Sequence, residues 1–306
     1  MQFIHDFSPL QALKSRFFPE LRLWVKRDDL LHPEVSGNKF RKLKYPLLAL
    51  QGFSPTLVTM GGAWSNHLHA LAHAAKIAGY PLHALVRGHD DLSTPSSDTL
   101  SDCVHLGMQI HFVSRADYRE LRSAPDVWRR HIKTLSASTV WLPEGGSAPA
   151  ALHGVAELID ELFSNSFESD DFASTTLVVA CGTGATLAGL LAGLKGRGRV
   201  LGIAVIKNAE YLHGEIAKLL RQAGYPAYQN YELLTDFHHG GYAKAPPELR
   251  QFCTDFSAET GIPVEPVYSG KMFYALHKLS QAGFFSSDER VVAIHTGGLQ
   301  GARGFL

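Results

Sequence analysis

The octapeptide SGNKFRKL, which spans Ser36–Leu43, places three cations within four residues, shortly after the charged run KRDDL. Gly37 and Asn38 are turn-forming residues, so the sequence predicts that Lys39 lies where a loop enters a helix running toward Leu50. Most short basic clusters are solvated helix starts, and that interpretation competes here. Three later glycine-bearing loops favour instead a lysine that faces a ligand.

Each of these loops follows an apolar run: GGAWSNH at residues 61–67, ACGTGAT at 180–186 and HTGG at 295–298. A lysine that can form a Schiff base, a loop that cradles a phosphate, and hydroxyl and amide groups that hold a ring are the parts that a pyridoxal phosphate site requires. The combination is informative, whereas the lysine cluster alone would not single out this cofactor.

The loop at 182–186 has the composition of an anion site. Its glycines let backbone N–H groups approach a phosphate, and the following helix N-terminus adds partial positive charge. An ordinary tight turn and a dinucleotide-binding loop are the competing interpretations. Against a dinucleotide, Leu187 stands where a third glycine is needed, and Lys207 rather than an acid ends the next strand. The predicted phosphate contacts are Gly182, Thr183, Gly184, Ala185 and Thr186.

Five motifs in this order, SGNKFRKL, SNH, GTGAT, VYSGK and HTGG, make the chain resemble the D-cysteine desulfhydrase and 1-aminocyclopropane-1-carboxylate deaminase family. That family belongs to the pyridoxal-phosphate enzymes with the tryptophan synthase β fold. The resemblance extends from about Lys26 to the C-terminus. It implies pyridoxal 5'-phosphate as cofactor, with Lys39 as the Schiff-base lysine that also moves a substrate proton. It implies further that Lys42, one helical turn on, contacts the phosphate.

The resemblance also assigns roles in the other loops. Asn66 matches the residue that hydrogen-bonds the cofactor's 3'-oxygen, and Ser65 matches the one that faces the substrate, although it can also cap a helix. Tyr268 faces the reacting part of the substrate as a candidate acid or base, and Tyr242 matches a second tyrosine near it. Thr296 presents a hydroxyl to the pyridine nitrogen, which weakens the electron sink and suits elimination.

Two residues depart from the family pattern. Trp64 replaces the usual glutamine before SNH, and Ser269 follows the tyrosine where cyclopropane-opening deaminases carry glutamate. Serine is short and neutral, so it does not replace that carboxylate. The predicted function is therefore a lyase that deaminates a small amino acid, with β-elimination from D-cysteine or a similar substrate preferred. The alternatives are 1-aminocyclopropane-1-carboxylate deamination, an NAD(P)-dependent oxidoreductase and a non-catalytic amino-acid-binding protein.

Composition bounds the class of protein. The chain has 306 residues and zero net charge, so neither nucleic acid nor a membrane surface is expected as a partner. Its first residues lack the apolar region of a secretory signal, and three widely spaced cysteines favour the cytoplasm over a disulfide framework. His69 and His73 are one helical turn apart without an acid, so no metal site is predicted. The expected partners are a small amino-acid substrate and, in a homodimer, a second copy of the chain.

Strands and helices alternate along the chain, which predicts an α/β fold with mainly parallel sheets covered on both faces. We expect two three-layer α/β domains, the tryptophan synthase β-like arrangement called fold type II of the pyridoxal-phosphate enzymes. Residues 1–45 and 150–306 form the predicted larger, cofactor-binding domain, and residues 46–149 form the smaller inserted one. Lys39 then lies near the cleft between them. Val264–Val267 is predicted to be a short strand that leads into Tyr268.

Overall fold

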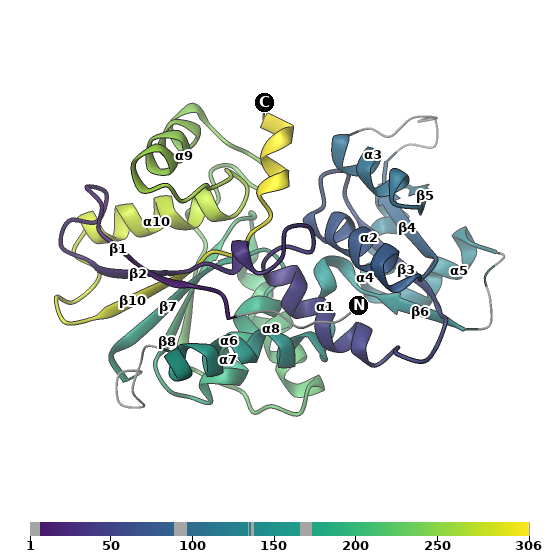
Figure 1. Cartoon of the computed structure of the whole chain (residues 1–306), viewed down its shortest axis with the longest axis horizontal. Helices are drawn as coiled ribbons and strands as arrows, with labels where there is room; N and C mark the ends of the chain where they lie inside the picture. Colours follow the sequence, from purple (N-terminus) through teal and green to yellow (C-terminus); the bar gives the residue numbers. More distant parts are fainter. Residues whose placement is uncertain (1–6, 89–96, 134, 136–137, 166–172, 306) are drawn as a thin grey trace.

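The computed structural model describes residues 7–88, 97–133, 135, 138–165 and 173–305. Within these residues the chain forms two separate sheets, each covered by helices on both faces, and Figure 1 shows the two units side by side. The fold class predicted from the sequence is confirmed.

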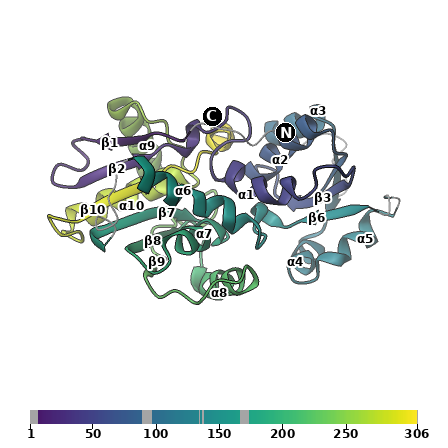
Figure 2. The same ribbon diagram turned by 60° about the horizontal axis from the view of Figure 1, so that its bottom comes forward.

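The larger sheet has six strands among the described residues, in the order β1-β2-β10-β7-β8-β9. Only the pair of β1 with β2 is antiparallel in this sheet. Helices α6, α7 and α8 pack on one face and α9 and α10 on the other, which Figure 2 shows from a second side. The strands are β1 (Leu10–Leu13), β2 (Arg22–Lys26), β7 (Thr175–Cys181), β8 (Arg199–Ala204), β9 (Tyr231–Leu234) and β10 (Arg290–Ile294), and the helices are α6 (Ala151–Asn165), α7 (Ala185–Leu194), α8 (Leu212–Gln222), α9 (Pro247–Thr260) and α10 (Ser269–Gln281).

The smaller sheet has four parallel strands in the order β5-β4-β3-β6. Apolar side chains of α1, α2 and α3 pack on one face, and those of α4 and α5 pack on the other. The elements are α1 (Asn38–Leu48), β3 (Thr56–Gly61), α2 (Asn66–Ala78), β4 (Leu82–Arg87), α3 (Asp98–His105), β5 (Met108–Val113), α4 (Arg115–Ser123), α5 (Trp128–His131) and β6 (Thr139–Leu142). These strands all fall inside the segment 46–149, and the exact domain boundaries stay a prediction.

Short 3-10 turns connect several elements, and one of them, η3, belongs to the site described below. They are η1 (Asp28–Leu30), η2 (Pro125–Val127), η3 (Glu144–Gly146), η5 (Ala209–Tyr211) and η6 (Leu299–Phe305). No helix in the described part of the chain combines the length and the hydropathy that crossing a membrane requires.

The loop before α1 is held against the loop after β10 by a close backbone approach. Gly37 has φ of 60°, and a Cβ atom added to it would lie 1.9 Å from the carbonyl oxygen of Thr296. Only glycine fits that position. The Asn38 N–H donates to the same carbonyl oxygen at 3.1 Å. The first and last motifs of the sequence therefore meet directly.

The predicted strand at Val264–Val267 is wrong. This segment is irregular and turns at 266–268 before α10 begins at Ser269. The reason is Glu265, whose buried carboxylate accepts hydrogen bonds from the N–H groups of Val267, Tyr268 and Ser269 at 2.6–2.8 Å. These bonds wrap the backbone around one side chain, so no ladder with a neighbouring strand forms.

Candidate active site

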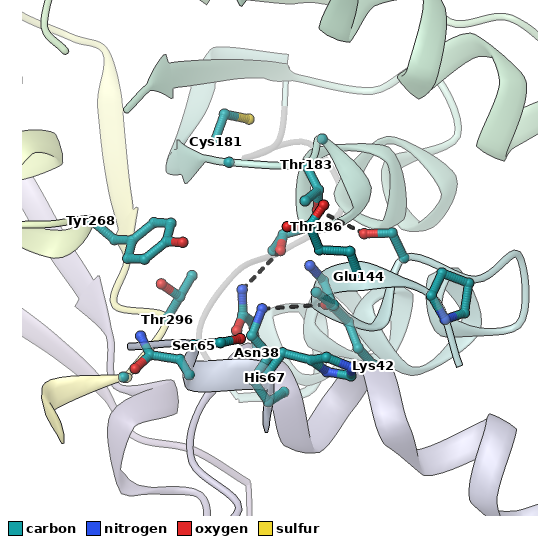
Figure 3. A pocket seen from close by; sticks show the side chains of 18 of the residues that line it. Asn38, Lys42, Ser65, His67, Glu144, Cys181, Thr183, Thr186, Tyr268 and Thr296 are labelled. Atoms are coloured by element: carbon teal, nitrogen blue, oxygen red, sulfur yellow. Dashed lines mark hydrogen bonds between the residues drawn. The ribbon is translucent and has the colours of Figure 1, made fainter. Parts of the chain in front are cut away.

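A cavity of about 1050 Å³ opens between the two units, where α1 and the three glycine-bearing loops converge. Figure 3 shows Lys42, Thr183 and Thr186 at one end of this pocket and Tyr268 and Thr296 at another. Ala185 is the one predicted residue whose side chain does not line it, because that methyl group packs into the core as α7 begins. The predicted residues that line the cavity are Lys39, Lys42, Ser65, Asn66, Gly182, Thr183, Gly184, Thr186, Tyr242, Tyr268 and Thr296.

The three cations of the SGNKFRKL motif separate onto different faces of α1. Arg41 is buried and binds two carboxylates, Asp28 through Nε at 2.6 Å and Glu161 through Nη1 at 2.8 Å. Lys39 and Lys42 lie one turn apart and line the cavity instead. The alternative of a solvated basic helix start is therefore wrong, because Arg41 is 1% exposed and Lys42 is 2% exposed.

Lys39 has the electrostatic setting of a reactive amine. Burial lowers its pKa to about 8, and the negative charge of Glu144 works in the opposite direction. Its Nζ donates to the carbonyl oxygen of Gly145 at 3.3 Å. A lysine with such a pKa is partly unprotonated near neutral pH, which is the form that attacks an aldehyde or accepts a proton.

The opposite wall of the cavity is suited to a phosphate. Gly184 adopts a left-handed conformation at the N-terminus of α7, and no side chain caps that helix end. The Thr186 hydroxyl accepts a hydrogen bond from Asn38 Nδ2 at 3.0 Å, and Thr183 Oγ1 accepts one from Ser147 at 2.7 Å. Free N–H groups and the helix dipole favour an anion at this place.

Lys42 also lines this wall of the cavity. Burial and the neighbouring ammonium of Lys39 hold the pKa of Lys42 well below its ordinary value. Among the described residues, Lys42 Nζ donates no hydrogen bond to a protein acceptor. Lysine side chains and an uncapped helix N-terminus are donors of the kind that bind phosphate, so these residues fit the phosphate of pyridoxal phosphate.

His67 is buried beneath these lysines and is neutral. Its pKa is held well below the ordinary value by burial and by the charges of Lys39 and Lys42. Its Nε2 lies 2.9 Å from Thr59 Oγ1, and that hydroxyl already donates its proton to the Leu142 carbonyl at 2.8 Å. Nε2 must therefore carry the hydrogen, which leaves Nδ1 as a buried acceptor without a partner. Sequence reasoning assigned no role to this histidine beyond its place in a motif.

The N-terminus of α2 forms a further wall. Ser65 caps the helix by accepting a hydrogen bond from the Leu68 N–H at 3.3 Å, and it also lines the cavity. Asn66 Oδ1 accepts a hydrogen bond from the side-chain amide of Gln300. Gln300 follows the HTGG motif by two residues, so it was invisible to a motif search although it orients a predicted cofactor contact.

Tyr268 and Tyr242 face each other across the remaining side. Their ring centroids are 6.1 Å apart, with an angle of 70° between the rings. Burial raises the pKa of Tyr268 well above its ordinary value, so this phenol keeps its proton. The buried Glu265 carboxylate lies behind it, and burial raises the pKa of Glu265 to about 7.

The two departures from the family pattern lie outside this main cavity. Ser269 is buried at the start of α10, and its hydroxyl accepts a hydrogen bond from the Glu265 N–H at 3.0 Å. Trp64 lines a smaller cavity of about 190 Å³ that shares Asn66, Tyr242 and Tyr268 with the main one. Ser269 therefore acts on the pocket through the turn that carries Tyr268 rather than through its own hydroxyl.

The paired histidines of α2 each bind a different acid. His69 lies 3.5 Å from Asp102, and His73 lies 3.4 Å from Glu34. Among the residues that the structure describes, no group of three or more histidine, cysteine or acidic side chains is arranged to hold a metal ion.

The fold and the site together define a class. Two helix-covered α/β units enclose a lysine of lowered pKa, which shares its cavity with an uncapped helix N-terminus and a second lysine; this is the arrangement of the pyridoxal-phosphate enzymes of fold type II. The family described as pyridoxal-phosphate dependent enzymes matches residues 6–297, so the chain belongs to that family, and its cofactor is pyridoxal phosphate.

Individual relatives span nearly the whole chain. A bifunctional D-cysteine desulfhydrase/1-aminocyclopropane-1-carboxylate deaminase of Arabidopsis thaliana is 29% identical and covers 91% of this chain and 73% of its own length. A D-cysteine desulfhydrase of Salmonella typhimurium is 25% identical, with 97% and 93% covered. The crystal structure of an ACC deaminase homologue superposes with a TM-score of 0.81 at 30% identity, covering 98% of this chain and 92% of its own. These likenesses confirm the family resemblance seen in the motifs.

Proposed function

We propose that the chain is a pyridoxal-phosphate-dependent lyase that deaminates a small amino acid by β-elimination, with D-cysteine or a close analogue as substrate. The observation that carries the proposal is Lys39, an amine with a pKa of about 8 in the cavity that also contains an anion-binding helix end. The overall reaction converts D-cysteine and water into a keto acid, ammonia and hydrogen sulfide. The names of the Arabidopsis and Salmonella relatives support this substrate.

Residues of three elements would hold the cofactor. Thr183, Thr186 and Lys42 would bind its phosphate, Thr296 would meet its ring nitrogen, and Lys39 would bind its aldehyde carbon. When bound, pyridoxal phosphate supplies an electron sink for the substrate's α-carbon. The neutral hydroxyl of Thr296 beside the ring nitrogen would weaken this electron sink, which suits elimination.

The remaining residues would act on the substrate. The free N–H groups at the start of α2, beside Ser65, would bind the α-carboxylate. The unprotonated amine of Lys39 would remove the α-proton. Tyr268 keeps its proton because burial raises its pKa, so it would donate to the departing sulfur, with Tyr242 packed against its ring.

Deamination of 1-aminocyclopropane-1-carboxylate is the second candidate, because the Arabidopsis relative carries both names. Ring opening requires a group that stabilises or moves charge on a strained carbon. The residue after Tyr268 is Ser269, whose hydroxyl cannot replace a carboxylate in that role. Assays of the two substrates side by side decide the order. A higher catalytic efficiency on the cyclopropane would reverse it.

The lysine assignment is tested separately from the substrate. The purified protein is expected to show a visible absorption band that borohydride removes, and peptide mapping is expected to find the reduced cofactor on Lys39. Lys39→Ala should lose both the band and activity. Lys44→Ala is the matched control, since Lys44 lies on the same helix but pairs with Glu157 at 2.7 Å. Reducible cofactor on another lysine in Lys39→Ala would contradict the assignment.

We also propose a homodimer and a reducing compartment such as the cytoplasm. Cys103, Cys181 and Cys253 are all free and buried, which suits a compartment that does not form disulfides. Light scattering of the purified protein tests the dimer, and a monomer at micromolar concentration would exclude it.

A further inference from the structure

Lys271, the lysine of the VYSGK motif, is fully buried and lies outside the catalytic proposal above. Its Nζ donates to three backbone carbonyl oxygens, those of Val205 at 3.2 Å, His238 at 2.8 Å and Gly241 at 2.8 Å. Among the described residues no carboxylate forms an ion pair with it. All three protons of the ammonium are thus used by neutral oxygens.

The loop that supplies two of these carbonyls has an unusual backbone. His239, Gly240, Gly241 and Ala243 all have positive φ, of 52°, 96°, 123° and 53°. The left-handed region is disfavoured for histidine and alanine, so such a run persists only where surrounding contacts impose it. The Gly240 N–H donates to His238 Nδ1 at 2.9 Å, but that bond is local to the loop.

This loop carries a residue of the active site. Tyr242 lies between the positive-φ positions, lines the cavity and packs edge-on against Tyr268. The third carbonyl, that of Val205, directly follows β8, and the Val205 N–H bonds to the carbonyl of Cys181 just before the phosphate loop. Lys271 therefore links the loop at residues 237–243, which carries Tyr242, to the end of β8, beside the predicted phosphate site.

We propose that the cage formed by the Val205, His238 and Gly241 carbonyls is a monovalent-cation site that Lys271 fills with its own ammonium, and that this internal cation positions Tyr242. Backbone carbonyls replace the hydration shell of potassium-sized ions in the same manner, and an ammonium group is a cation of that class. Lys271 is a positioning residue in this scheme, since it acts through the loop. The cage itself does not depend on the proposed substrate; only the catalytic use of Tyr242 does.

The test is cation-specific rescue of stability, which needs no substrate. Lys271→Ala removes the ammonium and its stem, so the cage becomes open to an added ion. Its thermal midpoint is expected to rise by about 2 °C in 100 mM potassium or ammonium chloride, for a dissociation constant of about 10 mM. Tetramethylammonium chloride at the same ionic strength, too large for the cage, should give no such rise. The wild-type protein should respond equally to all three salts.

Lys271→Met is the matched control, because its side chain fills the same space without charge. It should be less stable than the wild type and indifferent to the choice of cation. An equal response of Lys271→Ala to all three salts would overturn the cation site. If that variant is not recovered folded, hydrogen exchange on Lys271→Met decides: faster exchange confined to 237–243 supports the proposal, and unchanged exchange there overturns it.

Discussion

Replacing Lys39 by methionine should make the cofactor-free protein more stable. Burial lowers the pKa of Lys39 from an ordinary 10.5 to about 8. The charged form of Lys39 therefore destabilises the folded state, whereas in the unfolded chain the same ammonium is fully hydrated. A change of this size corresponds to about 3 kcal/mol at most, because one pKa unit is worth about 1.4 kcal/mol. Methionine has a similar length and no charge, so it removes the penalty without leaving a cavity.

The sign of the pH dependence follows from proton binding. Between about pH 8 and pH 10.5 the unfolded state holds the Lys39 proton and the folded state does not, so wild-type stability rises with pH in that window. The advantage of Lys39→Met should therefore be full below about pH 8 and vanish toward pH 10.5. Removing the charge also relieves Lys42, whose pKa it lowers, and that contribution has the same sign.

Urea unfolding of cofactor-free wild type and Lys39→Met, from pH 6 to pH 10, measures this difference. Lys76→Met is the control, because Lys76 is an exposed lysine on α2. That variant should show a small difference that does not change with pH. If Lys39→Met is less stable than the wild type at pH 7, or if its extra stability grows above pH 8, the inference that burial destabilises the charged form of Lys39 is refuted.

Three further predictions concern the phosphate placement, the buried ion pairs of Arg41 and the charge beside Lys39. Thr186→Val and Lys42→Ala should each weaken cofactor retention, measured by dialysis and visible absorbance, while the fold survives; unchanged affinity in both would exclude the phosphate placement. Arg41→Met should lower the free energy of unfolding by about 3–5 kcal/mol in urea titrations, because it leaves the buried Asp28 carboxylate without a cation and leaves Glu161 with Lys26 alone; a loss below about 1 kcal/mol would contradict the buried network. Glu144→Gln should move the pH midpoint of cofactor capture downward, because the Glu144 charge raises the pKa of Lys39; an upward shift would disprove that influence.

The alternation of strands and helices made the fold accessible from the sequence. The run Thr176–Ala180 is apolar and β-branched, and a glycine turn and a helix follow it, so the β7–α7 unit was predictable from local pattern. The strands that sequence reasoning missed, β1 and β9, are the two edges of the larger sheet. Edge strands are short and half-exposed, so their apolar periodicity is weak.

The motifs located the residues of the site but not the partners of those residues. The three cations of SGNKFRKL look alike in one dimension, and only the fold shows that Arg41 turns toward Glu161, distant by 120 positions. The sequence around Glu265 predicts a strand, whereas in the structure its carboxylate accepts hydrogen bonds from the backbone of the turn before α10. Side-chain hydrogen bonds between distant segments leave no periodic signal, so these assignments needed the coordinates.

The meeting of Gly37 with Thr296 has a consequence for biosynthesis. In the larger sheet β10, near the C-terminus, inserts between β2 and β7, so β2 has no parallel neighbour until residues 290–294 have left the ribosome. The smaller sheet draws all its strands from residues 56–142 and can be completed while the rest is being translated. The lysine pocket is thus completed only after residues 290–298 have been made. Ribosome-bound chains that stop before residue 290 should contain the folded smaller unit and yet be unable to capture the cofactor.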